Sequence, residues 1–293
     1  MFNKNIHQWW SSGMHNKQVN EYKIAEHYQH GYLLAEIEDA IQKQGKNKTK
    51  LSLEDLALVD EFHIGGRIAS AHLLDQLKFK PQQNILDIGC GLGGAARFVA
   101  KRYHSFISGI DLTLEYIETG NELSNWLGLS NKVMLKQANA LNLPFERVHF
   151  DGAYMMHVGM NIKDKKQLFS EVCRVLKPHS FFGIYDVIQQ KKGDSIYPVP
   201  WAIQPQDSYL ASIDEYKRHL LSTGFKIIAI NNRRDFAIDF FQQIRAKNKL
   251  NGGPPALGIH TIMKTSAHQK LTNLRSSIEN NIVAPIGIIV QKC

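Results

Sequence analysis

The residues best placed to bind a small ligand form one short segment, Ile85-Leu86-Asp87-Ile88-Gly89-Cys90-Gly91-Leu92-Gly93-Gly94. An apolar run followed by glycines is typical of a strand that ends in a tight turn and opens a helix. Glycine lets the backbone come close to a ligand and take conformations that other residues avoid. In an α/β sheet, ligands bind outside the carboxyl ends of the strands, where such a turn lies. The segment therefore predicts a ligand site, although its glycines alone also fit a dinucleotide fingerprint.

Asp87 narrows the class of ligand. It stands two residues before the first glycine, at the end of the predicted strand. A carboxylate there would repel a pyrophosphate, because like charges repel strongly in a partly dry site. The same carboxylate suits a ligand with an ammonium group, such as the methionine moiety of S-adenosylmethionine (SAM). The alternative is a turn aspartate that accepts hydrogen bonds from its own loop.

Two further polar residues stand at the ends of the next predicted strands. Asp111 follows the glycines by about 20 residues, where an acidic residue can bind ribose hydroxyls. Its alternative role is to cap the helix that follows Thr113. Asn139 follows the third strand, and its amide can bond an adenine edge. An isolated asparagine at this place can also be a turn residue.

The elements that would position these residues alternate between strands and helices. Seven strands are expected, at Asn84–Ile88, Phe106–Ile110, Val133–Gln137, Phe150–Met156, Phe181–Ile188, Phe225–Asn231 and Ile286–Val290. Such alternation is typical of βαβ units and a parallel sheet, and right-handed crossovers place helices on both of its faces. The expected fold is therefore α/β, with a Rossmann-like, mostly parallel seven-stranded sheet. A turn at Lys177-Pro178-His179 is expected before the fifth strand.

Two helical regions lie outside this alternation. Residues 1–80 are expected to form an N-terminal helical cap, with one helix from Tyr22 and a capping box at Ser52-Leu53-Glu54-Asp55. Residues 235–282 form a helical insertion before the last strand. Together with the proline-containing loop 189–207, this insertion would close over the ligand domain 81–293 as a substrate lid, excluding water. The predicted substrate contacts are Tyr28, Tyr197 and Trp201.

Several motifs together resemble the class I SAM-dependent methyltransferases. They are LDIGCGLGG, GIDLT, NALNLPF, FDGAYMMHVGMNIKDK and EVCRVLKP, in this order from residue 84 to about residue 186. LVDEFHIGG at residues 58–66 and YPVPWA at residues 197–202 extend the match. These two resemble a subgroup near the sarcosine/dimethylglycine N-methyltransferases and the ubiquinone/menaquinone-type methyltransferases. One departure is Asn139, where the family commonly has Asp.

The resemblance implies a role for each matching residue. The implied cofactor-binding residues are Asp87, Gly89, Gly91, Gly93, Asp111, Leu112, Asn139, Ala140 and Met155. Asp87 and the glycines would surround the methionine end of SAM. Asp111 would bind the ribose hydroxyls, with Leu112 on the adenine face and Asn139 at the adenine edge. Met155, at the end of the fourth strand, would lie beside the reactive methyl group.

His157 is the predicted catalytic residue. Its ordinary pKa near 6.5 lets it accept a proton near neutral pH. Methyl transfer depends mainly on alignment, so a base matters only where the acceptor must lose a proton, as an amine, phenol or enol would. The alternative is a histidine that orients the substrate by hydrogen bonds. Tyr185 and Asp186, at the end of the fifth strand, are further candidates.

Composition and charge exclude several classes of protein. Hydrophobic residues make up 43% and charged residues 21%, which is globular usage. No run of about 18 apolar residues is present to span a membrane, and the first residues lack a secretory apolar region. Three cysteines without paired spacing argue against a disulfide framework and against a zinc site. We expect no metal and a reducing, cytoplasmic compartment.

The predicted function is methyl transfer from SAM to a small-molecule acceptor by in-line displacement, with an amine favoured over a quinol, phenol or carbon acceptor.

The net charge of +8 arises mostly in residues 226–293, which hold ten basic and three acidic residues. This keeps an RNA methyltransferase or nucleic-acid-binding module as an alternative, although the basic residues are scattered without an RNA-binding motif. An NAD-dependent oxidoreductase and an inactive cofactor-binding scaffold are further alternatives. The assembly state is open, with a homodimer among the options.

Overall fold

The centre of the protein is a seven-stranded sheet with the order β3-β2-β1-β4-β5-β7-β6. The computed structural model describes residues 27–28, 31–191, 193 and 195–293. The strands are β1 (Asn84–Ile88), β2 (Phe106–Asp111), β3 (Val133–Gln137), β4 (Phe150–Met156), β5 (Leu176–Gln189), β6 (Phe225–Asn232) and β7 (Val283–Lys292). Only β7 among them runs antiparallel to its neighbours, β5 and β6. The predicted mostly parallel sheet is confirmed.

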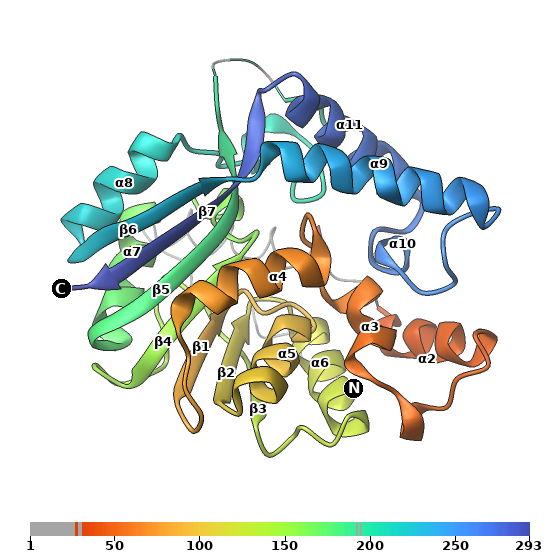
Figure 1. The fold of residues 1–293 in the computed structure, drawn as a ribbon, viewed down its shortest axis with the longest axis horizontal. Coiled ribbons are helices and arrows are strands. Elements are labelled where there is room, and N and C mark those ends of the chain that lie inside the picture. Colours follow the sequence, from red (N-terminus) through yellow and green to blue (C-terminus); the bar gives the residue numbers. More distant parts are fainter. Residues whose placement is uncertain (1–26, 29–30, 192, 194) are drawn as a thin grey trace, which may run out of the picture.

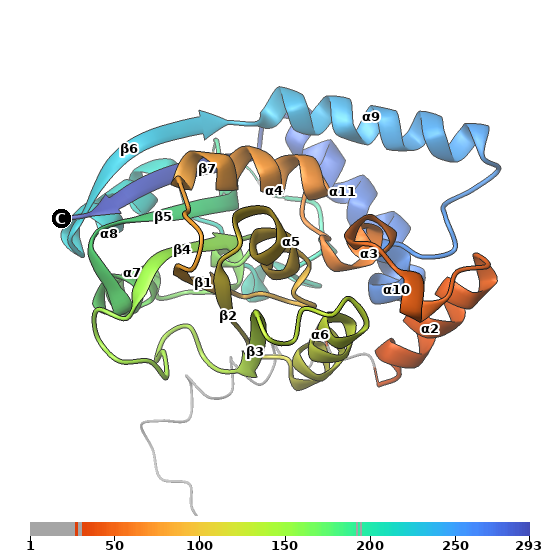
Figure 2. The same ribbon diagram turned by 60° about the horizontal axis from the view of Figure 1, so that its bottom comes forward.

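Helices cover both faces of this sheet (Figures 1 and 2). One face carries α4 (Gly66–Leu74), α5 (Gly94–Tyr103) and α6 (Leu114–Trp126), and the other carries α7 (Lys165–Val175) and α8 (Ile213–Ser222). Neighbouring residues of a strand point to opposite faces, so Ile85 and Leu86 of β1 belong to different hydrophobic clusters. Within the described residues, no helix has the length and apolar character needed to cross a membrane.

The predicted turn at Lys177-Pro178-His179 is wrong, because these residues lie inside β5. β5 begins at Leu176, which pairs with Phe150 of β4, and the next pair joins Phe181 to Gly152. The extra residues of β5 form a bulge between the two pairs. The Lys177 ammonium donates to Asp151 across this bulge at 2.6 Å. Pairing with β4 thus turns a segment with turn-like composition into an irregular strand.

The cap and the insertion pack on each other at one end of the sheet (Figures 1 and 2). The cap contains α2 (Leu33–Lys43) and α3 (Leu53–Asp60), and the insertion contains α9 (Arg234–Leu250), α10 (Ile259–Met263) and α11 (Ala267–Glu279). α10 contacts α2, α3 and α11, while α9 packs on α11. In the part of the chain that the structure describes, short 3-10 helices lie at Lys48–Lys50, Asp75–Leu77, Gly159–Asn161, Pro205–Asp207 and Lys264–Ser266.

The start of the cap is only partly described. Tyr22, where the first helix was predicted to begin, lies outside the described residues. The predicted capping box is present at the start of α3, where the Ser52 amide donates to Asp55 Oδ2 at 2.8 Å. The described part of the cap and the C-terminal helices α10 and α11 meet next to the cavity described below.

Candidate functional site

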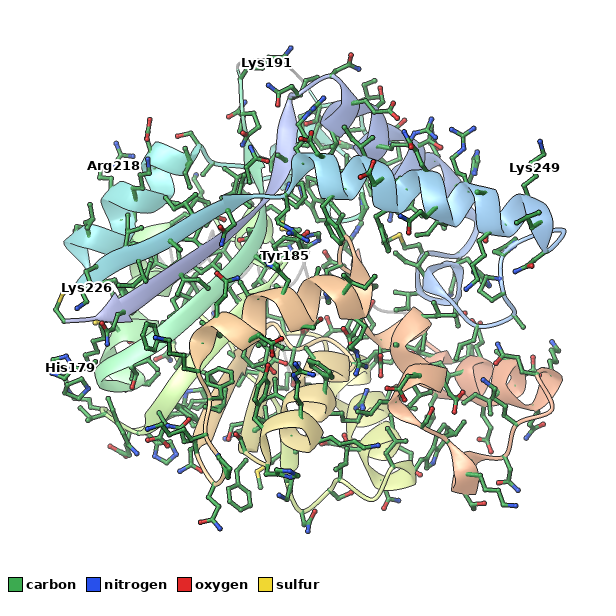
Figure 3. The ribbon with its side chains drawn as sticks, viewed as in Figure 1. His179, Tyr185, Lys191, Arg218, Lys226 and Lys249 are labelled. Atoms are coloured by element: carbon green, nitrogen blue, oxygen red, sulfur yellow. The ribbon has the colours of Figure 1, made fainter. Side chains whose placement is uncertain are left out.

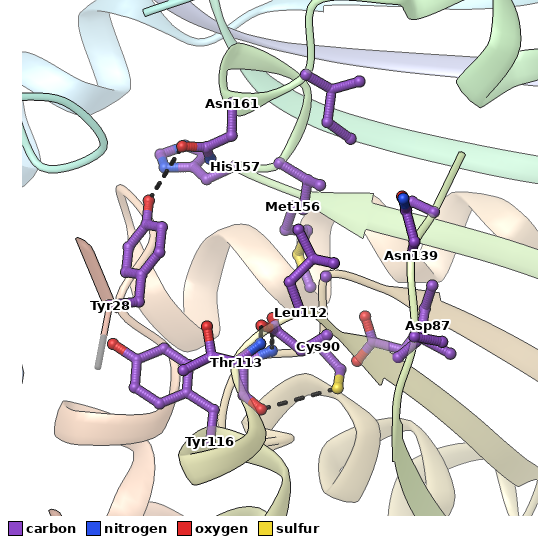
Figure 4. A pocket seen from close by; sticks show the side chains of 18 of the residues that line it. Tyr28, Asp87, Cys90, Leu112, Thr113, Tyr116, Asn139, Met156, His157 and Asn161 are labelled. Atoms are coloured by element: carbon purple, nitrogen blue, oxygen red, sulfur yellow. Dashed lines mark hydrogen bonds between the residues drawn. The ribbon is translucent and has the colours of Figure 1, made fainter. Parts of the chain in front are cut away.

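A cavity of about 590 Å³ opens at the carboxyl ends of the central strands (Figure 4). The strand ends and the turns after them supply most of its wall, and the cap supplies the rest. The principal lining residues are Tyr28, Asp60, Phe62, His63, Asp87, Gly89, Cys90, Gly91, Asp111, Leu112, Thr113, Tyr116, Asn139, Ala140, Met156, His157 and Asn161. Most of the residues predicted from sequence for a cofactor therefore share one cavity.

The glycine turn after β1 forms the floor of this cavity. Gly89 and Gly91 have φ angles of +67° and +53°, in the left-handed region that glycine adopts without strain. A Cβ atom at Gly89 would lie 2.4 Å from Val158 Cγ2. The turn therefore requires glycine for its backbone conformation and for the close approach of the segment after β4.

Asp87 is a buried carboxyl at the end of β1, and only 2% of it is exposed. Its Oδ2 accepts a hydrogen bond from the Tyr154 hydroxyl at 3.0 Å. Burial raises the pKa of Asp87 to about 8, because a charged carboxylate is poorly solvated there. A cationic ligand would offset that cost by pairing with the carboxylate. Asp87 can therefore bind an ammonium group at this end of the cavity.

Asp111 links the glycine turn to the helix that follows β2. Its Oδ1 accepts the Thr113 amide at 2.9 Å, and its Oδ2 accepts the Gly91 amide at 3.0 Å. Burial raises the pKa of Asp111. The predicted alternative, Asp111 as the cap of the next helix, is wrong, because Thr113 is the N-cap residue of α6 and Asp111 accepts the amide of Thr113 in the turn before it. A carboxylate offers about four acceptor positions, so Asp111 can also accept hydrogen bonds from ligand hydroxyls.

Asn139 and Ala140 form the cavity wall after β3. The Asn139 Oδ1 accepts the Leu141 amide at 2.8 Å, which is the turn role expected as an alternative. The amide nitrogen of Asn139 is not used by this turn. Leu112 presents an apolar side chain in the same cavity (Figure 4). The wall can therefore accommodate a flat, partly polar ring.

His157 lies on the side of the cavity away from Asp87 (Figure 4). Its ring stacks on Tyr185, with centroids 5.3 Å apart, and meets the His63 ring edge-on at 6.0 Å. The Nε2 atom is buried without a hydrogen-bond partner among the described residues. Burial, together with nearby His63, lowers the pKa of His157 well below its usual value. The ring is therefore neutral at pH 7 and has a nitrogen available to a ligand.

Asp186 holds the backbone that follows His157 and does not line the cavity. Its carboxylate accepts the Val158 and Gly159 amides, each at 2.9 Å, and the Tyr216 hydroxyl at 2.7 Å. Burial raises the pKa of Asp186 to about 6. Three donors fix this carboxylate, so its role here is to position the segment after β4.

The sequence interpretation missed several residues of the cap side. His63 lines the cavity, and its Nε2 lies 3.0 Å from Ser70 Oγ and 3.1 Å from the Gly66 carbonyl. Burial lowers the pKa of His63 to about 4. Tyr28, which was predicted, donates to Asn161 Oδ1 at 3.3 Å. The motif at residues 58–66 was the available signal for His63, while nothing local indicated the pairing of Tyr28 with Asn161.

Two predicted cofactor residues do not line the cavity. Met155 is fully buried in the sheet core, because side chains alternate along β4 and Met156 takes the cavity side. Gly93 lies beneath the turn, where a Cβ atom would meet Leu135 Cδ1 at 2.7 Å. Gly93 therefore allows close packing of α5 against β3.

Of the three predicted aromatic substrate contacts, Tyr28 lines this cavity, while Tyr197 and Trp201 do not. Trp201 is 4% exposed and donates from its indole nitrogen to Ser208 Oγ at 2.8 Å. Tyr197 packs against the same hydrophobic cluster, which includes Ile64 and Phe241. Both aromatic residues therefore pack in the lid region, and their neighbours Pro200 and Ile203 line a second cavity considered below.

The amino-acid sequence of this chain is similar to those of known methyltransferases. Residues 85–179 match the family model described as "Methyltransferase domain". An "O-methyltransferase" from Pyrenophora dematioidea is 32% identical over 178 residues, which are 59% of this chain and 62% of that relative. The chain spans less than two thirds of the length of the curated relatives that it matches.

Two solved structures are similar over most of the chain. A protein assigned as a sarcosine dimethylglycine methyltransferase from Galdieria sulphuraria has a TM-score of 0.65 at 19% identity, covering 88% of this chain and 98% of that one. Geranyl diphosphate C-methyltransferase from Streptomyces coelicolor A3(2) has a TM-score of 0.62 at 20% identity, covering 77% and 78%. The chain therefore has the fold of these methyltransferases, and its residues 85–179 match the methyltransferase family model.

Proposed function

We propose that this methyltransferase domain binds SAM and transfers its methyl group to a small-molecule acceptor. The observation that carries the proposal is the placement of Asp87 and Asp111 at the ends of paired strands in one cavity. Asp87 can pair with an ammonium group, and Asp111 can accept hydroxyl donors. SAM presents both kinds of group, whereas the pyrophosphate of NAD would meet the buried carboxyl of Asp87 unfavourably.

The rest of the cavity wall fits the same cofactor. Gly89 and Gly91 let the turn adopt its left-handed conformations at the floor of the cavity, with Val158 and Phe62 packed against them. Leu112, Asn139 and Ala140 offer two apolar surfaces and an amide to the adenine ring. The similar geranyl diphosphate C-methyltransferase was solved with S-adenosylhomocysteine, which supports the same cofactor here.

When bound, SAM supplies an electrophilic methyl group on a sulfonium centre. The residues of this chain must then align the acceptor and exclude water. Tyr28, Asn161 and His157 lie together on the side of the cavity away from Asp87 and Asn139 (Figure 4). We therefore place the acceptor on that side, beneath the cap. Residues of the lid segments 189–207 and 235–282 line the adjoining smaller cavity and not this one. The division into a cap at residues 1–80 and a domain at residues 81–293 stays a proposal, with α4 of the first range packed on the sheet.

We assign His157 to the orientation of the acceptor. Its lowered pKa means that the ring holds a proton poorly, and a nearby sulfonium would lower the pKa further by like-charge repulsion. The buried ring nitrogen without a partner can instead accept a hydrogen bond from an amine or hydroxyl group. The ring is held in place by stacking on Tyr185 and by its amide, which donates to the Tyr185 carbonyl at 2.7 Å.

An amine is the favoured acceptor. An amine attacks through its lone pair, so its ammonium form must first lose a proton. It can lose that proton to solvent before it binds, which is compatible with a histidine that is a weak base. The similar protein from Galdieria sulphuraria, assigned to sarcosine and dimethylglycine, also supports an amine. The names of other similar proteins refer to methylation of oxygen and carbon, so the panel of acceptors to be tested includes phenols and quinols.

Calorimetry with S-adenosylhomocysteine and with NAD tests the cofactor. We expect binding of S-adenosylhomocysteine and none of NAD, and the opposite result would overturn the proposal. A radiolabelled methyl-transfer assay on amines, quinols and phenols then tests the reaction. An RNA panel in the same assay tests the alternative, since RNA binding would weaken steeply with salt.

A further inference from the structure

A second, smaller cavity adjoins the first one. It has a volume of about 180 Å³ and shares the side chains of Tyr28, Phe62 and Tyr116 with the larger cavity. These three aromatic residues form the common wall. The remaining lining residues come from the cap, the loop after β5 and the insertion, and they are His27, Pro200, Ile203, Ile262, Met263, Lys264, Ser266 and Lys270. The cavity therefore lies where the cap meets the C-terminal helices.

The charged side chains of this second cavity are basic. His27, Lys264 and Lys270 line it, and no acidic residue is among its described lining. Lys270 lies on α11 and is only 6% exposed. No hydrogen bond or ion pair joins its ammonium group to another described residue. Most of Lys270 is buried while it lines this cavity, so an anionic ligand in the cavity can stabilise its charge.

His27 adds a second polar group to the same cavity. One ring nitrogen, Nε2, lies 3.1 Å from the Pro200 carbonyl, which fixes the ring against the loop. Burial lowers the pKa of His27, and the nearby charge of Lys270 acts in the same direction, while Asp207 acts against it. Burial also lowers the pKa of Lys270. Both groups line the same cavity, so an anion bound there would favour their charged forms.

We propose that the second cavity binds the acidic group, a carboxylate or a phosphate, of the methyl acceptor, with Lys270 as its main contact. The inference rests on the proposed function, because it takes the larger cavity as the place of methyl transfer. The acceptor would extend past the wall of Tyr28, Phe62 and Tyr116, with its reacting atom near His157. The second cavity is smaller than a pocket for a whole ligand, which fits a site for one small acidic group.

Thermal unfolding of the protein saturated with S-adenosylhomocysteine tests this site. The probes are sodium phosphate and sodium acetate, each compared with sodium chloride at equal ionic strength. We expect phosphate or acetate to raise the unfolding temperature of the wild type above the chloride value. The stronger of the two probes identifies the acidic group. The rise should be lost in Lys270→Gln and retained in Lys270→Arg.

Lys249→Gln is the matched control, because it removes the same charge from the exposed end of α9 (Figure 3). It should respond to the anions as the wild type does. An equal rise in Lys270→Gln and the wild type, or no rise in either, would overturn the inference. Absence of S-adenosylhomocysteine binding at the outset would instead defeat the proposed function, and this inference with it.

A kinetic comparison gives an independent measure. It uses an acceptor that the protein is found to methylate and that carries an acidic group. The second substrate is the same molecule with that acidic group converted to an amide. Lys270→Gln should raise the KM of the acid by about 10–100-fold, since a hydrogen bond to a charged group is lost. It should leave kcat and the affinity for S-adenosylhomocysteine nearly unchanged. An equal change in KM for the acid and the amide would show that Lys270 acts only on the fold.

Discussion

The cofactor side and the acceptor side of the cavity are built in different ways. On the cofactor side, Asp87, Asp111 and Asn139 each follow a strand of the same parallel sheet, so strand pairing alone brings them together. On the acceptor side, Tyr28 and His157 come from parts of the chain that meet only when the cap packs on the sheet. The comparison indicates that acceptor specificity can change without disturbing the cofactor residues.

The support beneath the two sides differs as well. Under the glycine turn, Arg97 is fully buried and donates to Asp60 and to the Leu92 carbonyl, each at 2.7 Å, and to the Gly120 carbonyl at 2.9 Å. Such a buried, hydrogen-bonded ion pair is costly to break. The acceptor side combines ring contacts, such as that between Tyr28 and Tyr116 with centroids 6.0 Å apart, with the hydrogen bonds of Asp186 to the segment after β4.

The largest expected effect is that of Asp87→Asn on cofactor binding. Loss of the carboxylate leaves the cofactor's ammonium group buried and unpaired, which should weaken binding by about 3–5 kcal/mol. Stability at pH 7 should be nearly unchanged, because Asp87 is largely protonated there in the free protein. Calorimetry with S-adenosylhomocysteine measures the effect, and Asp214→Asn on the exposed part of α8 is the control. Wild-type affinity in Asp87→Asn would break the distinction between the two sides.

Asp111→Ala should weaken S-adenosylhomocysteine binding by about 2–4 kcal/mol, since hydrogen bonds from both ribose hydroxyls to a charged acceptor are lost. Asp111→Asn retains one acceptor oxygen and should lose less. The KM of the acceptor should change little in either variant, which a methyl-transfer assay at saturating cofactor would show. Unchanged cofactor affinity would mean that Asp111 serves only the glycine turn and the turn before α6.

The pH dependence of cofactor binding sharpens the same comparison. Asp87 must lose a proton to pair with the ammonium group, and its pKa in the free protein is raised to about 8 by burial. Between pH 6 and pH 7 the affinity for S-adenosylhomocysteine should therefore rise nearly tenfold, that is, by about 1.4 kcal/mol. Titrations in buffers of different ionisation enthalpy should show proton release on binding. Asp87→Asn should abolish both, and a flat wild-type profile would contradict the assignment.

The smallest expected effect is on the acceptor side. If His157 orients the acceptor through one hydrogen bond, His157→Ala should lower kcat/KM by about 2–10-fold. His157→Gln should recover much of this loss, because its amide oxygen can accept the same bond but cannot take up a proton. Cofactor affinity should be unchanged in both variants. A loss of about 10²-fold or more in both, with an altered pH profile, would identify His157 as a general base.

The sequence by itself determined the cofactor side. The bounds of β1, β3 and β4 agree with those predicted, since short apolar runs between turn signals are local features. The positions of Asp87, Asp111 and Asn139 follow directly, because the carboxyl ends of parallel strands lie at one edge of a sheet. The glycine turn was also predictable, since the conformation of such a turn depends on its own residues.

Only the tertiary structure decided the acceptor side. Whether Met155 or Met156 reaches the cavity depends on the pleat of β4 and on which face carries the cap. Trp201 is an aromatic residue in a loop, and it packs inward into a hydrophobic cluster, whereas its neighbour Pro200 lines the second cavity. The residues of this loop do not by themselves indicate which of the two reaches a cavity. Lys270 resembles the other basic residues of the C-terminal region in sequence. It lines a buried cavity because α11 packs near the cap, and contacts between such distant segments have no local sequence pattern.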